Sequence, residues 1–172
     1  SDRFAVYQSM QEKFYDFLKL YRKQQLCFEN QEDDKMKDYT FKVPQDIVFG
    51  VGSLKRLPEL LEKSGSKKMM VVSDRGLEKL GVVKKVMDIV EAEGIETVSY
   101  LDVLPNPTVD MVDAATKVYK ESGATSIVAL GGGSPMDVAK AVGVLARYGG
   151  SITEYEGAHL VPGPIEPIIA IP

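Results

Sequence analysis

The stretch Ser126–Lys140, SIVALGGGSPMDVAK, decides the fold. Its first five residues are mostly apolar, which is typical of a short strand buried on both faces. Three glycines follow, Gly131–Gly133, and they allow a tight turn with no Cβ atom in the way of a ligand. Ser134 is then a good N-cap and Pro135 suits the first position of a helix. A strand that turns directly into a helix predicts an α/β domain.

The turn between this strand and this helix predicts an anion site. We expect the N–H groups of Met136 and Asp137 to face outward with the positive end of the helix dipole. Pyrophosphate is the ligand that this arrangement favours, with Gly132, Gly133 and Ser134 beside it. The loop is neither a G-x-G-x-x-G fingerprint nor a Walker loop. The alternative is a glycine-rich turn that only packs a helix against a strand.

The flanking sequence continues the alternation of strand and helix. We expect a helix capped by Ser53 that runs to about Lys63. Further strands are expected at Lys67–Ser73, Ile95–Leu101 and Glu166–Ile171, and further helices at Glu78–Glu93, Val109–Ser122 and Pro135–Tyr148. Because each crossover contains a helix, the strands should pair in parallel, as half of a doubly wound, Rossmann-like sheet flanked by helices.

Ligands of such a sheet bind outside the carboxyl ends of its strands. Asp74 follows the first strand of the alternation, where a carboxylate can accept from both hydroxyls of an adenosine ribose and repel a 2′-phosphate. The alternative for Asp74 is a helix or turn cap. Asn106 follows the second strand between two prolines, which make the loop stiff. Its amide suits an adenine edge, and the alternative is a plain rigid loop.

Residues 1–38 differ from the rest and form a separate segment in this interpretation, before an α/β domain at 39–172. Large apolar residues at helical spacing predict an amphipathic helix: Tyr7, Met10, Phe14, Phe17 and Tyr21. A charged linker follows to residue 38. Packing inside the protein or between subunits, and docking on a separate partner, both remain open for this stripe. Tyr39–Val43 and Asp46–Phe49 predict a β-hairpin.

Composition excludes several classes of function. The 172 residues carry a net charge of −4, which disfavours nucleic acid and anionic membranes as partners. Cys27 is the only cysteine, so neither an internal disulfide nor a zinc cage of cysteines is expected. No apolar run has membrane-spanning length, and we expect a cytoplasmic protein. His159 is the only histidine, and we assign no metal ligand and no catalytic residue.

Several of these motifs, in this order and spacing, resemble the iron-containing, or group III, alcohol dehydrogenases over about residues 39–172. The motifs are FGVGS at Phe49–Ser53, VSD at Val72–Asp74, PNPT at Pro105–Thr108, GGGSPMDVAK at Gly131–Lys140 and IAIP at Ile169–Pro172. The PNPT loop together with the long glycine motif makes the resemblance specific.

The resemblance implies a nucleotide-binding α/β domain followed by an all-helical domain that binds Fe²⁺ or another divalent metal. The metal polarises the substrate oxygen while hydride passes between a small alcohol or aldehyde and the nicotinamide. Carried over residue by residue, it places the pyrophosphate at Gly132, Gly133, Ser134, Met136 and Asp137. It places the ribose at Asp74 and the adenine at Asn106. NAD is then favoured over NADP, which stays open, and a homodimer through residues 39–49 is expected.

The family pattern continues beyond Ile-Pro, so we expect the metal ligands to lie outside these 172 residues and this chain alone to be inactive. Two other hypotheses remain. One is a non-catalytic NAD-binding or assembly module that docks through residues 1–38. The other is a relative of glycerol dehydrogenase, which shares the glycine triplet.

Overall fold

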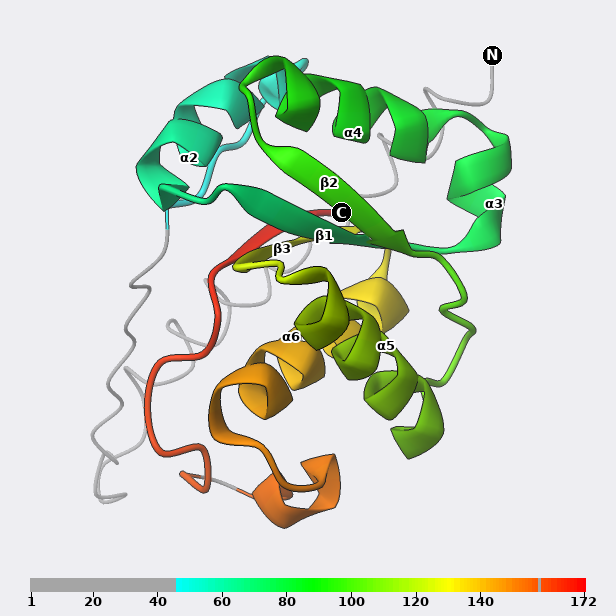
Figure 1. Ribbon diagram of the computed structural model, residues 1–172. Coiled ribbons are helices and arrows are strands. Elements are labelled where there is room, and N and C mark those ends of the chain that lie inside the picture. The colour runs from blue at the N-terminus through cyan, green and yellow to red at the C-terminus, as the bar shows by residue number, and fades with distance from the viewer. Residues whose placement is uncertain (1–45, 158) are drawn as a thin grey trace, which may run out of the picture. The chain divides into compact units, whose positions relative to one another are not determined.

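The structure is a computed structural model that describes residues 46–157 and 159–172 (Figure 1). Four parallel strands form one sheet in the order β2-β1-β3-β4. Their bounds are β1 Lys68–Val72, β2 Glu96–Tyr100, β3 Ser126–Leu130 and β4 Ile168–Ile171. The expected α/β fold with a parallel sheet flanked by helices is confirmed.

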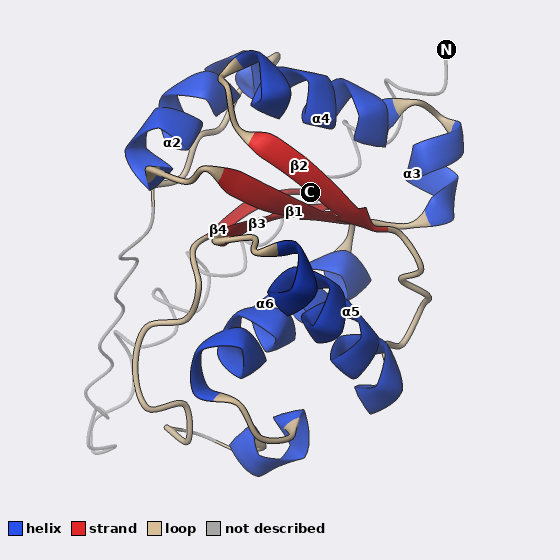
Figure 2. Ribbon diagram, viewed as in Figure 1, coloured by secondary structure: helices blue, strands red, loops and turns tan. Residues whose placement is uncertain are grey.

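Helices cover both faces of this sheet (Figure 2). Helices α2 and α4 lie on one face, and α5 and α6 lie on the other. The α-helices are α2 Leu57–Ser64, α3 Arg75–Lys79, α4 Val82–Ala92, α5 Val109–Ser122 and α6 Gly133–Tyr148. Two short 3₁₀ helices are η1 Ser53–Arg56 and η2 Ile152–Tyr155.

Alternating side chains of the two central strands build two hydrophobic cores. One core, under α5 and α6, takes its strand residues from one face of the sheet: Met70, Val72, Ile127 and Ala129. The other, under α2 and α4, takes them from the opposite face: Met69, Val71, Val128 and Leu130. Because successive strand residues point to opposite faces, a strand covered on both sides must be apolar throughout. This explains the unbroken apolar runs of β1 and β3.

The single helix expected at Glu78–Glu93 is two helices, α3 and α4. Asp74 caps α3 through its side chain, so the first helix starts at Arg75, earlier than expected. The break lies at Gly81, whose backbone is left-handed with φ of 73°. Only glycine adopts this conformation at no steric cost, so the glycine ends one helix and allows the next to begin.

The expected start of the first helix and the expected hairpin were wrong in part. Gly52, with φ of 75°, is the N-cap of η1, and no side chain caps it, so Ser53 is not the cap. The α-helical hydrogen bonding begins only at Leu57. Residues 46–49 form no strand, and the Ile47 and Phe49 side chains are exposed. Tyr39–Val43 and residues 1–38 lie outside the described residues.

Candidate functional site

The strand order reverses between β1 and β3. From β1 the chain crosses to β2 on one side, and from β2 it returns to β3 on the other. In doubly wound sheets a ligand crevice forms at this switch point, outside the carboxyl ends of the two strands. The residues that follow β1 and β3 are Ser73-Asp74 and Gly131-Gly132, so the topology brings the two strongest sequence motifs together.

Backbone hydrogen bonds hold the glycine loop in this position. The Gly131 N–H donates to the Ile171 carbonyl oxygen at 2.9 Å, which ties the loop to β4. Gly131 has φ of 128°, and a Cβ atom there would lie 3.1 Å from both Leu77 Cδ1 and Pro135 Cγ. Any other residue at position 131 would therefore strain the loop.

The next two glycines leave open space. A Cβ atom on Gly132 or Gly133 would meet no heavy atom within 4 Å. Because neither residue has a positive φ, the backbone does not require glycine at these two positions. Their lack of side chains exposes the amide edge of the loop, as expected for close approach of a ligand.

Helix α6 starts at Gly133, with Gly132 as its N-cap and no side-chain cap, so the expected cap at Ser134 was wrong. The extended backbone of Gly132 already starts the helix, which puts Ser134 inside the first turn. The Met136 N–H donates to the Gly132 carbonyl oxygen at 3.5 Å, so it is not a free donor. The first-turn amides that have no intrahelical acceptor are those of Gly133 and Ser134, since Pro135 has no N–H.

The side chains of Met136 and Asp137 point elsewhere. Met136 packs against the core under α5 and α6. Asp137 is exposed, and its Oδ1 lies 3.5 Å from the Lys140 Nζ one turn along the helix. Neither residue lines the clefts described below. Helix α6 therefore begins two residues earlier than the expected start at Pro135, and the anion site at its N-terminus stays a prediction.

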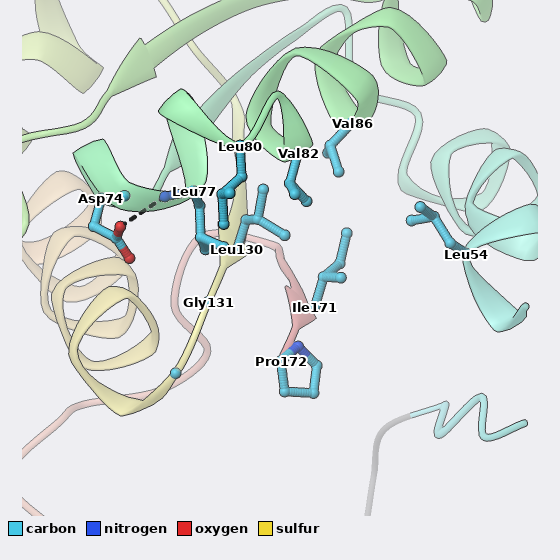
Figure 3. A pocket seen from close by; sticks show the side chains of 12 residues that line it. Leu54, Asp74, Leu77, Leu80, Val82, Val86, Leu130, Gly131, Ile171 and Pro172 are labelled. Atoms are coloured by element: carbon cyan, nitrogen blue, oxygen red, sulfur yellow. Dashed lines mark hydrogen bonds between the residues drawn. The ribbon is translucent and has the colours of Figure 1, made fainter. Parts of the chain in front are cut away.

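Asp74 has the capping role that the sequence left open, and its contact with the ribose stays a prediction. Its Oδ1 accepts from the Leu77 N–H at 2.9 Å and so caps α3 (Figure 3). Its Oδ2 has no hydrogen-bond partner among the described residues and lies near the glycine loop, 3.7 Å from where a Cβ on Gly131 would be. One oxygen thus orients the carboxylate, and the other is available to a ligand.

Two open clefts meet at this point. The first, here called the loop cleft, has a volume of about 680 Å³ and is lined by residues 74–76, 101–105 and 132–135. It brings Asp74, Gly132, Gly133 and Ser134 together. The second, the apolar cleft, has a volume of about 560 Å³. Leu77, Leu80 and Val82 line it on one side, with Ile171 and Pro172 opposite (Figure 3).

The PNPT loop leads directly into helix α5. Thr108 caps α5, and its Oγ1 accepts from the Met111 N–H at 3.3 Å. Asn106 is exposed with φ of 56°, in the left-handed region that asparagine tolerates better than most residues. It does not line the loop cleft, although Pro105 does. The adenine contact of Asn106 stays a prediction.

An ion-pair cluster on the rim of the loop cleft was missed at the sequence level. Arg75 donates from Nε to Asp102 Oδ1 at 2.9 Å and from Nη1 to Glu78 Oε2 at 3.0 Å. The hydrogen bond to Glu78, followed by that to Asp102, raises the pKa of the Arg75 guanidinium. The backbones of Asp74 and Asp102 form an isolated bridge, so β1 and β2 present their carboxyl-end acids side by side.

No group of three or more metal-binding side chains occurs in the part of the chain that the structure describes. His159 has a left-handed backbone with φ of 65° and lines neither cleft. We therefore assign no metal ligand to residues 46–157 and 159–172. Within the same ranges, no helix is both long and apolar enough to cross a membrane.

Comparison with known proteins finds the same kind of domain. The family model of iron-containing alcohol dehydrogenases matches residues 44–172. A choline dehydrogenase of Bacillus subtilis is 37% identical over 143 residues, which are 81% of this chain and 36% of that protein.

Two solved structures align over most of the described domain. The crystal structure of a 1,3-propanediol oxidoreductase has a TM-score of 0.74 at 32% identity and covers 78% of this chain and 35% of its own. Sulfoacetaldehyde reductase from Bifidobacterium kashiwanohense, solved in complex with NAD⁺, has a TM-score of 0.71 at 29% identity over 79% of this chain and 36% of its own. The chain thus spans about a third of the length of the relatives it matches, and it belongs to the iron-containing alcohol dehydrogenase family.

Proposed function

We propose that this chain is the nucleotide-binding part of an NAD-dependent oxidoreductase that acts on a small alcohol or aldehyde. The observation that carries the proposal is the convergence of Asp74 and the glycine loop at the switch point between β1 and β3. The bound nicotinamide would supply the hydride acceptor or donor. The residues of this chain would bind and orient the dinucleotide.

The chemistry of the loop cleft fits the polar parts of a dinucleotide. The two free first-turn amides of α6, on Gly133 and Ser134, suit the pyrophosphate at the positive end of the helix dipole. The unpaired Oδ2 of Asp74 suits a ribose hydroxyl donor, and the same charge disfavours a 2′-phosphate. On this basis NAD is preferred over NADP. Asn106 is proposed to contact the adenine. Met136 and Asp137 are proposed to support the pyrophosphate site indirectly, by stabilising the start of α6 through core packing and an ion pair with Lys140.

For the substrate we propose only a chemical class, a small alcohol or aldehyde. Three of the relatives are named for choline, 1,3-propanediol and sulfoacetaldehyde, yet each matches about four fifths of this chain. This supports a shared nucleotide site with a substrate site that varies among the relatives. Fe²⁺ or another divalent metal is proposed for the longer enzyme. The described residues provide no group of three or more side chains that could hold it.

We also propose roles for residues 1–38, an oligomeric state and a location. Residues 1–38, with their aromatic stripe, are proposed to dock within an assembly, and a homodimer is proposed without an assigned interface. A cytoplasmic location is supported only by the single cysteine, which suits a reducing compartment. We propose that turnover requires the longer polypeptide, whereas NAD binding is already present in this chain.

The test places a carboxylate where the pyrophosphate should lie. Gly133→Asp has room for its side chain, and an acid at the first helical position is favourable for the helix, so the variant should fold. We expect it to weaken NADH binding by at least about tenfold, as repulsion between like charges predicts. Titration of NADH fluorescence on the 172-residue chain measures the Kd, and circular dichroism and Tm check the fold.

Gly133→Asn is the matched control, because it has nearly the same size without the charge. We expect a smaller loss of affinity with Asn than with Asp. An Asp variant that binds NADH as tightly as the wild type would show that no phosphate lies at the start of α6, and the proposal would be wrong.

A further inference from the structure

Arg75, at the proposed ribose end of the loop cleft, is paired with two carboxylates. All three nitrogens of the Arg75 guanidinium contact carboxylates: Nε and Nη2 lie 2.9 Å from Asp102 Oδ1, and Nη1 lies 3.0 Å from Glu78 Oε2. Planar guanidinium groups use this fork of donors to bind carboxylates or phosphates. In this chain the donors of Arg75 are directed to protein carboxylates and away from any ligand.

The position of Arg75 makes this occupancy important for cofactor choice. Arg75 follows Asp74 directly and lines the same cleft. In dinucleotide-binding sheets, an arginine near the ribose acid accommodates the 2′-phosphate of NADP. A free Arg75 would therefore partly offset the repulsion that Asp74 exerts on a 2′-phosphate.

The net negative charge around Arg75 also disfavours a 2′-phosphate. The Arg75 guanidinium pairs with the carboxylates of Glu78 and Asp102, and Asp74 precedes it directly in the sequence. These four side chains together carry a net charge of −2. The cluster contributes little to folding, because ion pairs with side chains as exposed as these stabilise proteins weakly. Its electrostatic effect on a doubly charged phosphate in the adjoining cleft is the larger consequence.

We propose that Glu78 and Asp102 are specificity-determining residues that keep the guanidinium of Arg75 paired with carboxylates and so exclude 2′-phosphorylated dinucleotides. The inference rests on the proposed NAD site and extends it, because it adds two residues beyond Asp74 to the discrimination. Glu78 acts without lining the cleft, through its hydrogen bonds to Arg75.

The test compares the Kd for NADPH with the Kd for NADH in the wild type and in Glu78→Gln. This variant removes one charge and releases Nη1. We expect it to improve NADPH binding about threefold to tenfold, the size expected for one charge acting on a phosphate across partly solvated surface. NADH binding should change by less than about twofold. Asp102→Asn should act in the same direction, and the double variant should exceed either single one.

Arg75→Ala tests whether the gain in NADPH affinity depends on the guanidinium. Added to the double variant, it should remove most of the gain in NADPH affinity, because the phosphate then has no freed guanidinium to bind. A gain that persists without Arg75 would overturn its role. The gain should also shrink at high salt, because these groups are exposed.

Asp88→Asn is the matched control. Asp88 pairs with Lys84 on α4 at 2.6 Å and lines neither cleft, so it removes the same charge from an ion pair elsewhere. It should leave the NADPH to NADH ratio unchanged. A ratio that shifts as much in Asp88→Asn as in Glu78→Gln, or in neither, would overturn the inference. A wild-type chain that fails to bind NADH would instead contradict the proposed function.

Discussion

The Ser73 hydroxyl donates to the Leu130 carbonyl oxygen at 2.8 Å, across the gap between the carboxyl ends of β1 and β3. Ser73 is fully buried, and its N–H donates to the Tyr100 carbonyl oxygen at 3.0 Å. One residue thus links three neighbouring strands directly below the residue that begins the glycine loop. We regard Ser73 as a positioning residue for the candidate site.

Ser73→Ala tests this link. The substitution leaves the buried Leu130 carbonyl oxygen without its side-chain donor, which should cost about 1 to 2 kcal/mol in the free energy of unfolding. Urea denaturation measures the loss. NADH affinity should also fall by a few fold, because the loop that follows Leu130 loses its anchor. Full stability together with normal NADH binding would show that the bond has no positioning role.

Ser126→Ala is a contrasting prediction at the other end of β3. Ser126 is also buried, yet its Oγ is the one buried side-chain N or O atom without a hydrogen-bond partner in the described part of the chain. Burying an unpaired hydroxyl costs free energy, so alanine should be neutral or stabilise the protein by up to about 1 kcal/mol. A loss of more than about 1 kcal/mol in the same urea experiment would mean that this hydroxyl has a partner in solution.

Local signals predicted the regular elements well. Helix α5 and strand β3 have the predicted bounds. Thr108 and Gly123 mark the two ends of the helix, and the apolar run Ile127–Leu130 ends at the first glycine of the loop. The strand alternation also predicted that Asp74 and the glycine loop would meet. These features depend on neighbours in sequence and on a simple topological rule.

The features that were missed depend on backbone conformation or on distant contacts. Gly81 breaks a helix because its φ is positive, and the residue pattern around it still fits one long helix. The preference of Ser134 and Pro135 for the N-cap and first helical positions predicted that α6 begins at Pro135. The N-cap is instead Gly132, and the helix begins at Gly133. The bond from Arg75 to Asp102 joins the first residue of α3 to the segment after β2, 27 residues away in the sequence, and no spacing rule indicates it.

Gly131 and Gly132 should respond differently to alanine. Gly131→Ala meets two side chains at 3.1 Å in a left-handed backbone, so we expect a loss of about 2 to 4 kcal/mol in unfolding free energy. Gly132→Ala meets nothing within 4 Å, so its stability should change by less than about 0.5 kcal/mol. It should nonetheless weaken NADH binding, because its methyl group enters the loop cleft. Equal stability of the two variants would contradict the distinction between them.

Tyr119 should make the protein sensitive to alkali. Its side chain is buried and its hydroxyl donates to Glu166 Oε2 at 3.4 Å. Burial, and then the charge of Glu166, raises the pKa of Tyr119. The native state therefore keeps this proton to higher pH than the unfolded chain does. The stability that Tyr119 contributes is fully present below about pH 10 and is lost as the pH rises through the pKa of the folded state.

Above pH 10 we expect the free energy of unfolding to fall as the pH rises. Tyr119 alone should account for about 1.4 kcal/mol of this fall per pH unit. Tyr119→Phe removes the ionisable group, so the decline between pH 9.5 and 11 should be shallower than in the wild type. Burial also raises the pKa of Tyr100, so part of the decline should remain. Urea denaturation across this pH range measures both slopes. Equal slopes in the two proteins would show that Tyr119 ionises alike in the folded and unfolded states, against the burial seen here.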